Sequence, residues 1–445
     1  MDNLIVMDKE WHLKHLDQIK KKAGARYTPE LNVDLPISEI FDGISRTEKF
    51  YATIREKHGE LFREFRYVTS KYEESELQKN YDQIKKEIET LFKLIESTKD
   101  YNTSLIPWDE IQKQTKVLED NLWIFTDQLR SAKEQVNNIK EPPKSDCNYQ
   151  PSLSEKFISD IHHAYKTREI IRYFNELALG TKAKLSNHPF LLLTGSAGTG
   201  KTHLLCDVVE HRINNEKGIL PAYLVFGEYF SDGKDVWLQI LEQLDILGLF
   251  TNKDKFLKRL EELGKNEKCR SLLIIDALNE THTSEFWKNN LDRLIEEIKK
   301  YPNIALIVSI RNGFEKEVMK GKQKEIFIHE EHNGFRFREW EAVNKFFKAF
   351  SLPLPEIPLL MPEFQNPLFL LVFCKAFEKR KNKKDKQIFR GHEGATYIFE
   401  TYIDSISKPI EKSFKIESGP KKNIWDTIIE KIAEDENRTD EQVDS

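Results

Sequence analysis

The most restrictive feature of the sequence is a glycine-rich octapeptide that runs from Gly195 to Thr202 and reads Gly-Ser-Ala-Gly-Thr-Gly-Lys-Thr. It matches the pattern GxxxxGK[ST], and it lies between an apolar run at 190–193 and a helical pattern at 203–214. Glycines let backbone N–H groups turn inward around a phosphate, and the helix that follows presents the positive end of its dipole. The sequence therefore predicts a phosphate-binding loop between a strand and a helix.

Nucleotide chemistry assigns roles to the residues of this loop. We expect the ammonium of Lys201 to reach the β- and γ-phosphates and the hydroxyl of Thr202 to ligate Mg²⁺. The expected nucleotide contacts are the loop residues and the histidine after them, namely Gly195, Ser196, Ala197, Gly198, Thr199, Gly200, Lys201, Thr202 and His203. ATP or ADP with Mg²⁺ is accordingly the predicted cofactor.

Short apolar runs alternate with helical patterns on both sides of the loop. These runs are 190–193, 222–226, 272–275, 304–308 and 326–328. Runs of four or five apolar residues with helices between them suit a parallel sheet that is covered on both faces. The predicted fold class is an α/β P-loop NTPase, with a parallel sheet and helices on both of its faces.

Polar residues follow the third and fourth runs, where the carboxyl ends of parallel strands form a crevice. Asp276 is the expected second Mg²⁺ contact, through water, while Glu280 would polarise the attacking water and Asn279 would help to hold that water or the metal shell. Arg311 follows the fourth run and would sense or stabilise the γ-phosphate charge. The alternatives are a turn or helix-capping role for Asp276 and an ordinary surface position for Arg311.

The region N-terminal to the sheet is charged and almost free of glycine. Two runs have apolar residues spaced by three and four: Leu77, Tyr81, Ile84, Ile88, Leu91 and Ile95, and then Ile111, Thr115, Leu118, Leu122, Phe125 and Leu129. This spacing predicts two long helices in an antiparallel hairpin, and it leaves open whether they form a bundle wall or an oligomerisation arm. Two prolines at 142–143 place a boundary near residue 145.

Amphipathic helical patterns return after about residue 336, at 342–350, 368–378 and 397–406. We therefore expect a small C-terminal helical domain in addition to the N-terminal hairpin. The predicted organisation is an extended or helical segment at 1–45, the hairpin domain at 46–145, the P-loop NTPase domain at 146–335, and a helical lid at 336–445 with the start of a possible winged helix.

Together these residues resemble the NACHT-type branch of the STAND NTPases, which are relatives of the AAA+ ATPases, and especially its bacterial antiphage members. The resemblance covers residues 150–435 and places Asp276–Glu280 at the family's DGLDE pattern. It implies that Arg311 is the sensor arginine and that Pro367, in the sequence Asn-Pro-Leu, packs near the nucleotide base. Ala277 and Asn279 replace the commoner Gly and Asp, which puts rapid hydrolysis, but not binding, in question.

The resemblance implies an ATP-dependent switch in antiviral defence that ADP holds closed and that ATP exchange opens for self-association. It also implies a slow or triggered Mg²⁺-dependent ATPase. Family members usually continue into a winged helix and a repeat array, whereas this chain ends after a helical pattern at 425–432. We therefore expect either that the chain is a fragment or that its sensor is another polypeptide. The alternatives are an AAA+ ATPase that acts on DNA, as a loader or transposition regulator, and an assembly scaffold that never turns nucleotide over.

Composition bears on three further questions: nucleic-acid binding, the cellular compartment and contact with a membrane. Lys plus Arg number 69 and Asp plus Glu number 74, so the net charge of −5 argues against a polybasic protein but leaves a local basic groove open. The basic run 379–386 lacks interleaved aromatic residues and is interpreted as a solvated loop rather than a nucleic-acid site. Four scattered cysteines and the lack of an apolar stretch of membrane-spanning length favour a reducing cytoplasm and no membrane contact.

Overall fold

The computed structural model describes residues 7–68, 75–98, 100–137, 152–248, 250, 252–352, 354 and 362–378. Its contacts divide the chain into two units. The first is made of Met1–Tyr27, Pro36–Ala197 and Lys201–His332, and the second of Thr28–Leu35, Gly198–Gly200 and Asn333–Ser445. The N-terminal segment and the glycine-rich loop therefore each contribute residues to both units.

The first unit contains a five-stranded sheet in the order β2-β3-β4-β1-β5, in which all neighbouring strands are parallel. The strands are β1 (Phe190–Thr194), β2 (Ala222–Phe226), β3 (Ser271–Asp276), β4 (Ile304–Ser309) and β5 (Ile328–Glu331). Leu192 of β1 lies opposite Val308 of β4, and Phe226 of β2 lies opposite Asp276 of β3. The polar residues that follow β1, β3 and β4 consequently meet at one edge of the sheet.

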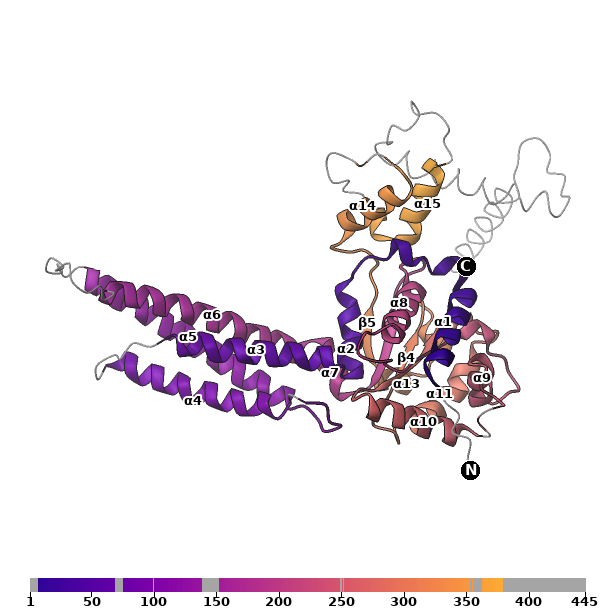
Figure 1. Ribbon diagram of the computed structural model, residues 1–445, viewed down its shortest axis with the longest axis horizontal. Coiled ribbons are helices and arrows are strands. Elements are labelled where there is room, and N and C mark those ends of the chain that lie inside the picture. Colours follow the sequence, from indigo (N-terminus) through magenta and orange to yellow (C-terminus); the bar gives the residue numbers. More distant parts are fainter. Residues whose placement is uncertain are drawn as a thin grey trace, which may run out of the picture. The chain divides into compact units, whose positions relative to one another are not determined.

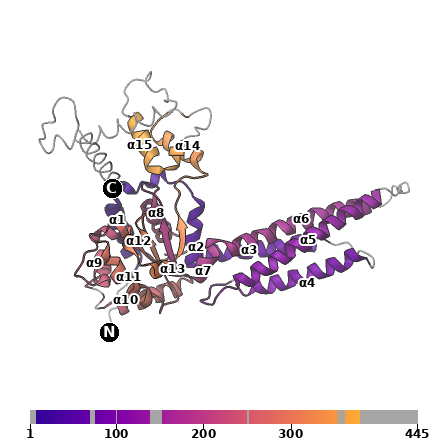
Figure 2. The same cartoon turned by 180° about the vertical axis from the view of Figure 1, so that it is seen from behind.

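Helices cover both faces of this sheet (Figure 1 and Figure 2). Neighbouring residues of β1 belong to different hydrophobic clusters, since Leu192 packs in one and Leu191 and Leu193 pack in the other. The first cluster includes α9 (Val236–Gln243), α10 (Lys253–Asn266) and α11 (Glu285–Ile298), and the second includes α1 (Lys9–Ala23), α2 (Glu39–Ser45) and α8 (Lys201–Ile213). This arrangement confirms the predicted fold class, and the first four apolar runs form strands as expected.

The fifth strand differs from the prediction. The apolar run 326–328 was expected to form it, but Ile326 ends α13 (Gly321–Ile326) and the strand occupies Ile328–Glu331. β5 pairs only with β1 at the edge of the sheet, and its residues alternate between half-buried and exposed. Only alternate residues of β5 are half-buried, whereas every residue of β2 at the other edge is buried, so β5 needs no continuous apolar run. Phe327 instead packs in the first hydrophobic cluster. Two further short helices, α7 (Thr181–Asn187) and α12 (Glu315–Val318), flank the sheet.

The helices between the N-terminal segment and the sheet form a four-helix bundle. They are α3 (Glu48–Arg66), α4 (Glu76–Glu96), α5 (Trp108–Asn137) and α6 (Leu153–Leu179), and they share one hydrophobic cluster. Asn80 donates to Gln128 over 2.8 Å and Gln114 donates to the carbonyl of Glu87 over 3.1 Å, so α4 and α5 are antiparallel. The predicted hairpin is therefore present within a larger bundle.

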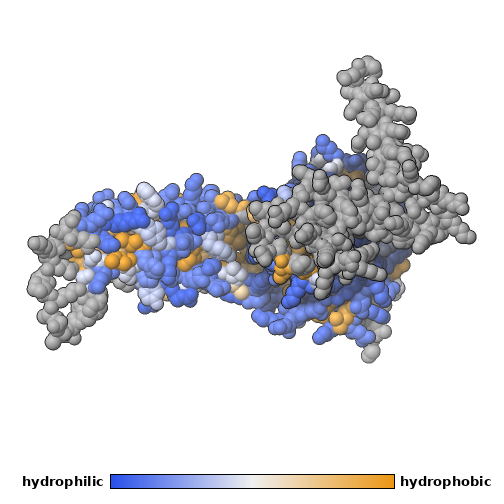
Figure 3. Space-filling view, turned by 90° about the horizontal axis from the view of Figure 1, so that it is seen from above, coloured by the Kyte–Doolittle hydropathy of each residue, from blue (hydrophilic) through white to orange (hydrophobic). Residues whose placement is uncertain are grey.

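Helix α6 lies C-terminal to the boundary expected near residue 145, yet it packs with α3 and α5 rather than with the sheet. Ala164, Ile171 and Phe174 are fully buried in the bundle cluster. The boundary remains a prediction, and this packing favours a position near residue 180, where α6 ends. Figure 3 shows a mainly hydrophilic surface interrupted by separate apolar patches.

Three buried arginines link α2, the sheet and the segment between α4 and α5. Arg46, Arg212 and Arg270 have at most 5% of their surface exposed, and most of their hydrogen-bond acceptors are backbone carbonyl oxygens. Arg212 also donates to the hydroxyl of Ser45 over 2.9 Å. Burial lowers the pKa of Arg270 to about 10. The end of α2 is thereby held to the residues that directly precede β2 and β3.

The second unit contains α14 (Glu339–Ala349), α15 (Pro367–Glu378) and the short helices η2 (Pro29–Leu31) and η6 (Pro362–Gln365). Leu31 and Val33 are buried in its core, together with Phe346. The predicted helices at 342–350 and 368–378 are present, whereas those at 397–406 and 425–432, like the basic run at 379–386, lie outside the described residues. The proline-rich N-terminal segment thus forms part of the C-terminal helical unit.

One buried histidine predicts a pH dependence of stability. The ring Nε2 of His15 accepts a hydrogen bond from the backbone N–H of Leu224 over 3.3 Å, and burial lowers the pKa of His15 to about 3. In the unfolded chain a histidine binds a proton below about pH 6.5, so the free energy of unfolding falls by about 1 kcal/mol per pH unit between pH 6 and 4 from this residue alone. Urea unfolding of the chain at pH 7 and pH 5 measures how the free energy of unfolding changes with pH.

The variant His15→Gln keeps an acceptor near Leu224 but does not titrate in this range. We expect it to lose about 1 kcal/mol less stability than the wild type between pH 6 and pH 5. An equal loss in both proteins would contradict the assignment.

Candidate functional site

The glycine-rich loop connects β1 to α8 with two glycines in left-handed conformations. Gly198 has φ 75° and Gly200 has φ 93°. A Cβ atom on Gly198 would lie 2.8 Å from the side-chain oxygen of Asn366 and 2.8 Å from Cβ of Leu368. The carbonyl of Gly198 also accepts a hydrogen bond from the N–H of Leu368 over 3.1 Å. Glycine is therefore required at position 198 by both its backbone conformation and its close neighbours.

Lys201 and Thr202 form the first turn of α8. The ammonium of Lys201 donates to the carbonyl of Gly195 over 2.6 Å and to that of Ser196 over 3.0 Å. Burial lowers the pKa of Lys201, and the carboxylate of Asp276 opposes this shift. These two hydrogen bonds hold the ammonium of Lys201 against the start of the loop. Lys201 is also the first residue of α8.

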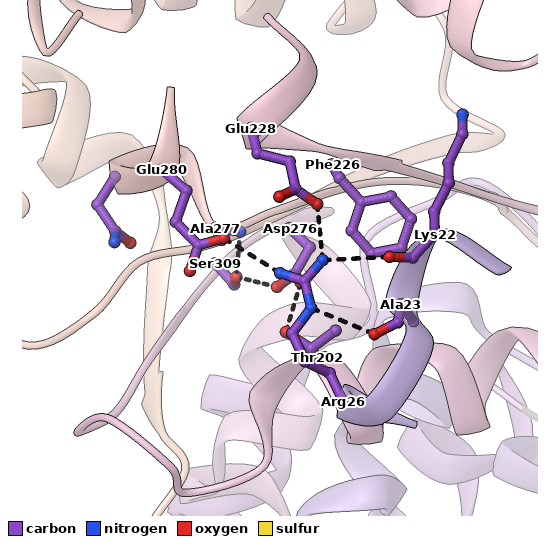
Figure 4. Close-up of polar contacts among 12 residues, drawn as sticks. Lys22, Ala23, Arg26, Thr202, Phe226, Glu228, Asp276, Ala277, Glu280 and Ser309 are labelled. Atoms are coloured by element: carbon purple, nitrogen blue, oxygen red, sulfur yellow. Dashed lines mark hydrogen bonds and ion pairs between the residues drawn. The ribbon is translucent and has the colours of Figure 1, made fainter. Parts of the chain in front are cut away.

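The carboxylate of Asp276 lies at the centre of the site and is almost completely buried (Figure 4). It accepts hydrogen bonds from the hydroxyl of Thr202 over 2.7 Å and from the hydroxyl of Ser309 over 2.5 Å. Ser309 in turn accepts from the backbone N–H of Ala277 over 2.7 Å. The ends of β3 and β4 and the start of α8 are thus joined through one carboxylate.

The residue after Asp276 has a strained backbone. Ala277 has φ 56° and ψ 59°, a left-handed conformation that costs a non-glycine residue energy. The neighbouring end of β2 passes close by, since a Cβ on Gly227 would lie 2.1 Å from the carbonyl oxygen of Ala277. Glycine is therefore the residue that position 277 would accommodate with the least backbone strain.

Glu280, Asn279 and Arg311 lie beside this centre. The amide oxygen of Asn279 accepts from the backbone N–H of Arg311 over 2.9 Å, and a guanidinium nitrogen of Arg311 lies 3.9 Å from Glu280. Burial raises the pKa of Glu280, Arg26 opposes this shift, and repulsion from Asp276 adds to it. The structure therefore brings the predicted acidic and basic residues together and gives Asn279 a backbone partner.

Sequence analysis did not identify Arg26 as part of this site. Its guanidinium lies 3.1 Å from the carboxylate of Glu280 and 2.6 Å from that of Glu228, and Figure 4 shows it between the two. It also lies over the ring of Phe226, with 5.6 Å to the ring centroid. Residues 26 and 280 are 254 positions apart, so no local pattern could have linked them. The sequence analysis assigned the segment around Arg26 only to an extended or helical segment at 1–45.

The other residues that were predicted to contact the nucleotide lie in the loop, in α8 and at the start of α15. Ser196, Ala197 and Thr199 lie within the loop, and the ring of His203 contacts that of Tyr27 edge to face at a centroid distance of 5.0 Å. Pro367 begins α15, directly after Asn366, whose side chain accepts from the N–H of Phe369 over 3.2 Å. Contacts of these residues with a nucleotide remain predictions.

The described residues contain no cluster of three or more His, Cys, Asp or Glu side chains with the arrangement of a metal site. The oxygen pair of Thr202 and Asp276 is therefore the candidate position for a nucleotide-bound cation. Across the described ranges, no helix has the length and apolar character needed to cross a membrane.

One family model matches the part of the chain that contains this site. Residues 183–316 match a protein family described as an AAA domain. The structure of PCH-2 from C. elegans is similar at 13% sequence identity and a TM-score of 0.22, and the match covers 50% of this chain and 61% of that chain. No curated protein matches the sequence. The parallel sheet and the glycine-rich loop show the α/β P-loop NTPase fold, and the family match agrees with it.

The strain at Ala277 predicts a stabilising substitution. Ala277→Gly relieves the left-handed strain of an alanine but makes the unfolded chain more flexible, so we expect a net gain of about 0.5 kcal/mol in unfolding free energy. As a control, Ala183→Gly in α7 should lose about 1 kcal/mol, because Ala183 is helical and buried. Thermal unfolding of the three proteins measures both effects. Destabilisation by Ala277→Gly would show that the strain costs less than the added flexibility.

Proposed function

We propose that this protein is an ATP-binding switch, similar to the STAND NTPases, in which nucleotide exchange and hydrolysis change the conformation and permit self-association. The observation that carries this proposal is the contact between Thr202 and Asp276, next to Lys201 at the start of α8. This arrangement lies in a domain that matches an AAA family. It combines a cation position, a phosphate-binding lysine and a helix N-terminus.

The residues fit a nucleotide with its Mg²⁺ ion. The hydroxyl of Thr202 and the carboxylate of Asp276 are hard oxygen ligands, and they are 2.7 Å apart. Bound Mg²⁺ offsets the negative charge of the β- and γ-phosphates. Lys201 donates to the carbonyls of Gly195 and Ser196 in this conformation, and it would exchange these acceptors for phosphate oxygens.

Two further residues receive roles in hydrolysis. Glu280 would accept the proton of the attacking water, and Arg311 would stabilise charge on the γ-phosphate. Asn279 supplies no carboxylate, and it holds the backbone N–H of Arg311. A single acidic residue beside the attacking water suits a slow or triggered ATPase.

The resemblance to bacterial antiphage STAND proteins supports the biological setting. We place the switch in the cytoplasm and in antiviral defence, with self-association upon activation and a separate polypeptide as trigger, sensor or effector. The four-helix bundle α3–α6 is the candidate element for assembly.

The proposal predicts separate effects for two site residues. Lys201→Ala should weaken ATP binding by about 100-fold, because a charge-assisted phosphate contact is lost. Glu280→Gln should bind ATP normally but hydrolyse it about 100-fold more slowly in a single turnover, because the general base is removed. The matched control Lys234→Ala removes a lysine that pairs with Glu242 outside the site and should change neither quantity.

Equilibrium binding of a fluorescent ATP analogue and single-turnover hydrolysis measure these effects. ATP binding and ATP-dependent assembly that survive in Lys201→Ala would contradict the proposed function. If Glu280→Gln hydrolysed ATP at the wild-type rate, the role of Glu280 would be contradicted. If the wild-type chain bound nucleotide but never hydrolysed it, an assembly scaffold would be favoured.

A second candidate function is that of an AAA+ ATPase acting on DNA. One surface feature favours it: Phe337 has 81% of its surface exposed, and Arg336 lies over its ring at 5.0 Å from the centroid. Exposed aromatic and arginine side chains are typical of single-strand binding. This candidate predicts ATP-strengthened DNA binding that falls with salt and weakens about tenfold in Phe337→Ala. Filter binding at low salt that detects no DNA would exclude it.

A further inference from the structure

Arg26 holds the carboxylate to which the proposed function assigns water activation. One guanidinium nitrogen lies 3.1 Å from Glu280 Oε2, and the other lies 2.6 Å from Glu228 Oε1. About a third of each of the three side chains is exposed, so all three are partly shielded from solvent. The two nitrogens of one planar guanidinium thus hold two carboxylates from the ends of β2 and β3.

This pairing opposes the role of Glu280 as a base. A carboxylate oxygen that accepts a hydrogen bond from a guanidinium has less electron density to offer a water proton. Burial raises the pKa of Glu280, and the positive charge of Arg26 is the first influence that counters it. The same contact fixes where Glu280 Oε2 points.

The chain on either side of Arg26 is anchored differently. On its N-terminal side, Arg26 donates to the carbonyls of Lys22 and Ala23 in the last turn of α1, over 3.4 Å in each case. On its C-terminal side, the chain enters the second unit at Thr28, and Leu31 is buried in that unit's core. Two residues of extended chain span only about 7 Å. A displacement of the segment at 28–35 would therefore be transmitted to Arg26.

We propose that Arg26 is an inhibitory latch: its ion pairs with Glu280 and Glu228 restrain ATP hydrolysis, and movement of the segment at 28–35 with the C-terminal helical unit releases them. This inference rests on the proposed function, because it presupposes that Glu280 activates water. The latch is built from residues of this chain alone. It gives the helical unit a covalent route to the hydrolytic residue.

The test compares Arg26→Ala and Arg26→Gln with the wild-type chain in single-turnover ATP hydrolysis from pH 5.5 to 9. Both neutral variants should hydrolyse about three- to tenfold faster at pH 8, because a partner worth roughly one pKa unit is lost. The acidic limb of the pH profile should move to higher pH, since the pKa of Glu280 rises without Arg26. Arg26→Lys retains the charge and should remain closer to wild type.

Arg293→Ala is the matched control, since Arg293 also bridges two carboxylates, those of Asp235 and Glu297, but on the surface outside the site. It should leave both the rate and the pH profile unchanged. A reduced rate in the neutral Arg26 variants would show that Arg26 assists the reaction and would overturn the latch. An unchanged rate and pH profile, with ATP bound as in wild type, would overturn it equally.

Failure of the proposed function has a different signature. It would appear as an absence of ATP binding by the wild-type chain, or as binding that does not depend on Lys201. If the wild type and the neutral Arg26 variants all bind ATP and none hydrolyses it, the latch is wrong while nucleotide binding stands. The binding measurement therefore separates the two outcomes.

Discussion

The site depends on the buried carboxylate of Asp276. It accepts the hydroxyls of Thr202 and Ser309, so one side chain fixes the first turn of α8 against the ends of β3 and β4. Loss of this carboxylate would leave two hydroxyls in a low-dielectric environment without their acceptor. The position of Lys201, one residue before Thr202, follows from the same contact. The strained backbone of Ala277 is the local cost of turning the chain directly after this residue.

The parts of the fold that were predicted from the sequence are those with local signals. The loop has a fixed motif, α4 and α5 have a three-and-four periodicity, and strands β1 to β4 are continuous apolar runs. The edge strand at 328–331 was misplaced because it is buried on one side only. The contribution of Arg26 was missed because it depends on a tertiary contact across 254 residues. Likewise, the role of Ser309 depends on the register of β3 beside β4.

Helix α8 runs from the candidate site toward the segment that connects α4 and α5. Its first turn carries Lys201 and Thr202, and its last turn carries Arg212, which donates to Ser45 at the end of α2. The next residue, Arg46, is buried and donates to the carbonyl of Asn102, between α4 and α5. One rigid helix and a short chain of hydrogen bonds thus run from the phosphate-binding loop to the bundle.

The central proposal is that this chain is a nucleotide switch whose closed state holds ADP. Its most direct test is to purify the chain without added nucleotide, denature it, and identify what is released by chromatography. A closed switch that releases ADP slowly would keep it through purification, so we expect stoichiometric ADP. A site that is empty after purification and does not acquire nucleotide when ATP and Mg²⁺ are added would contradict it.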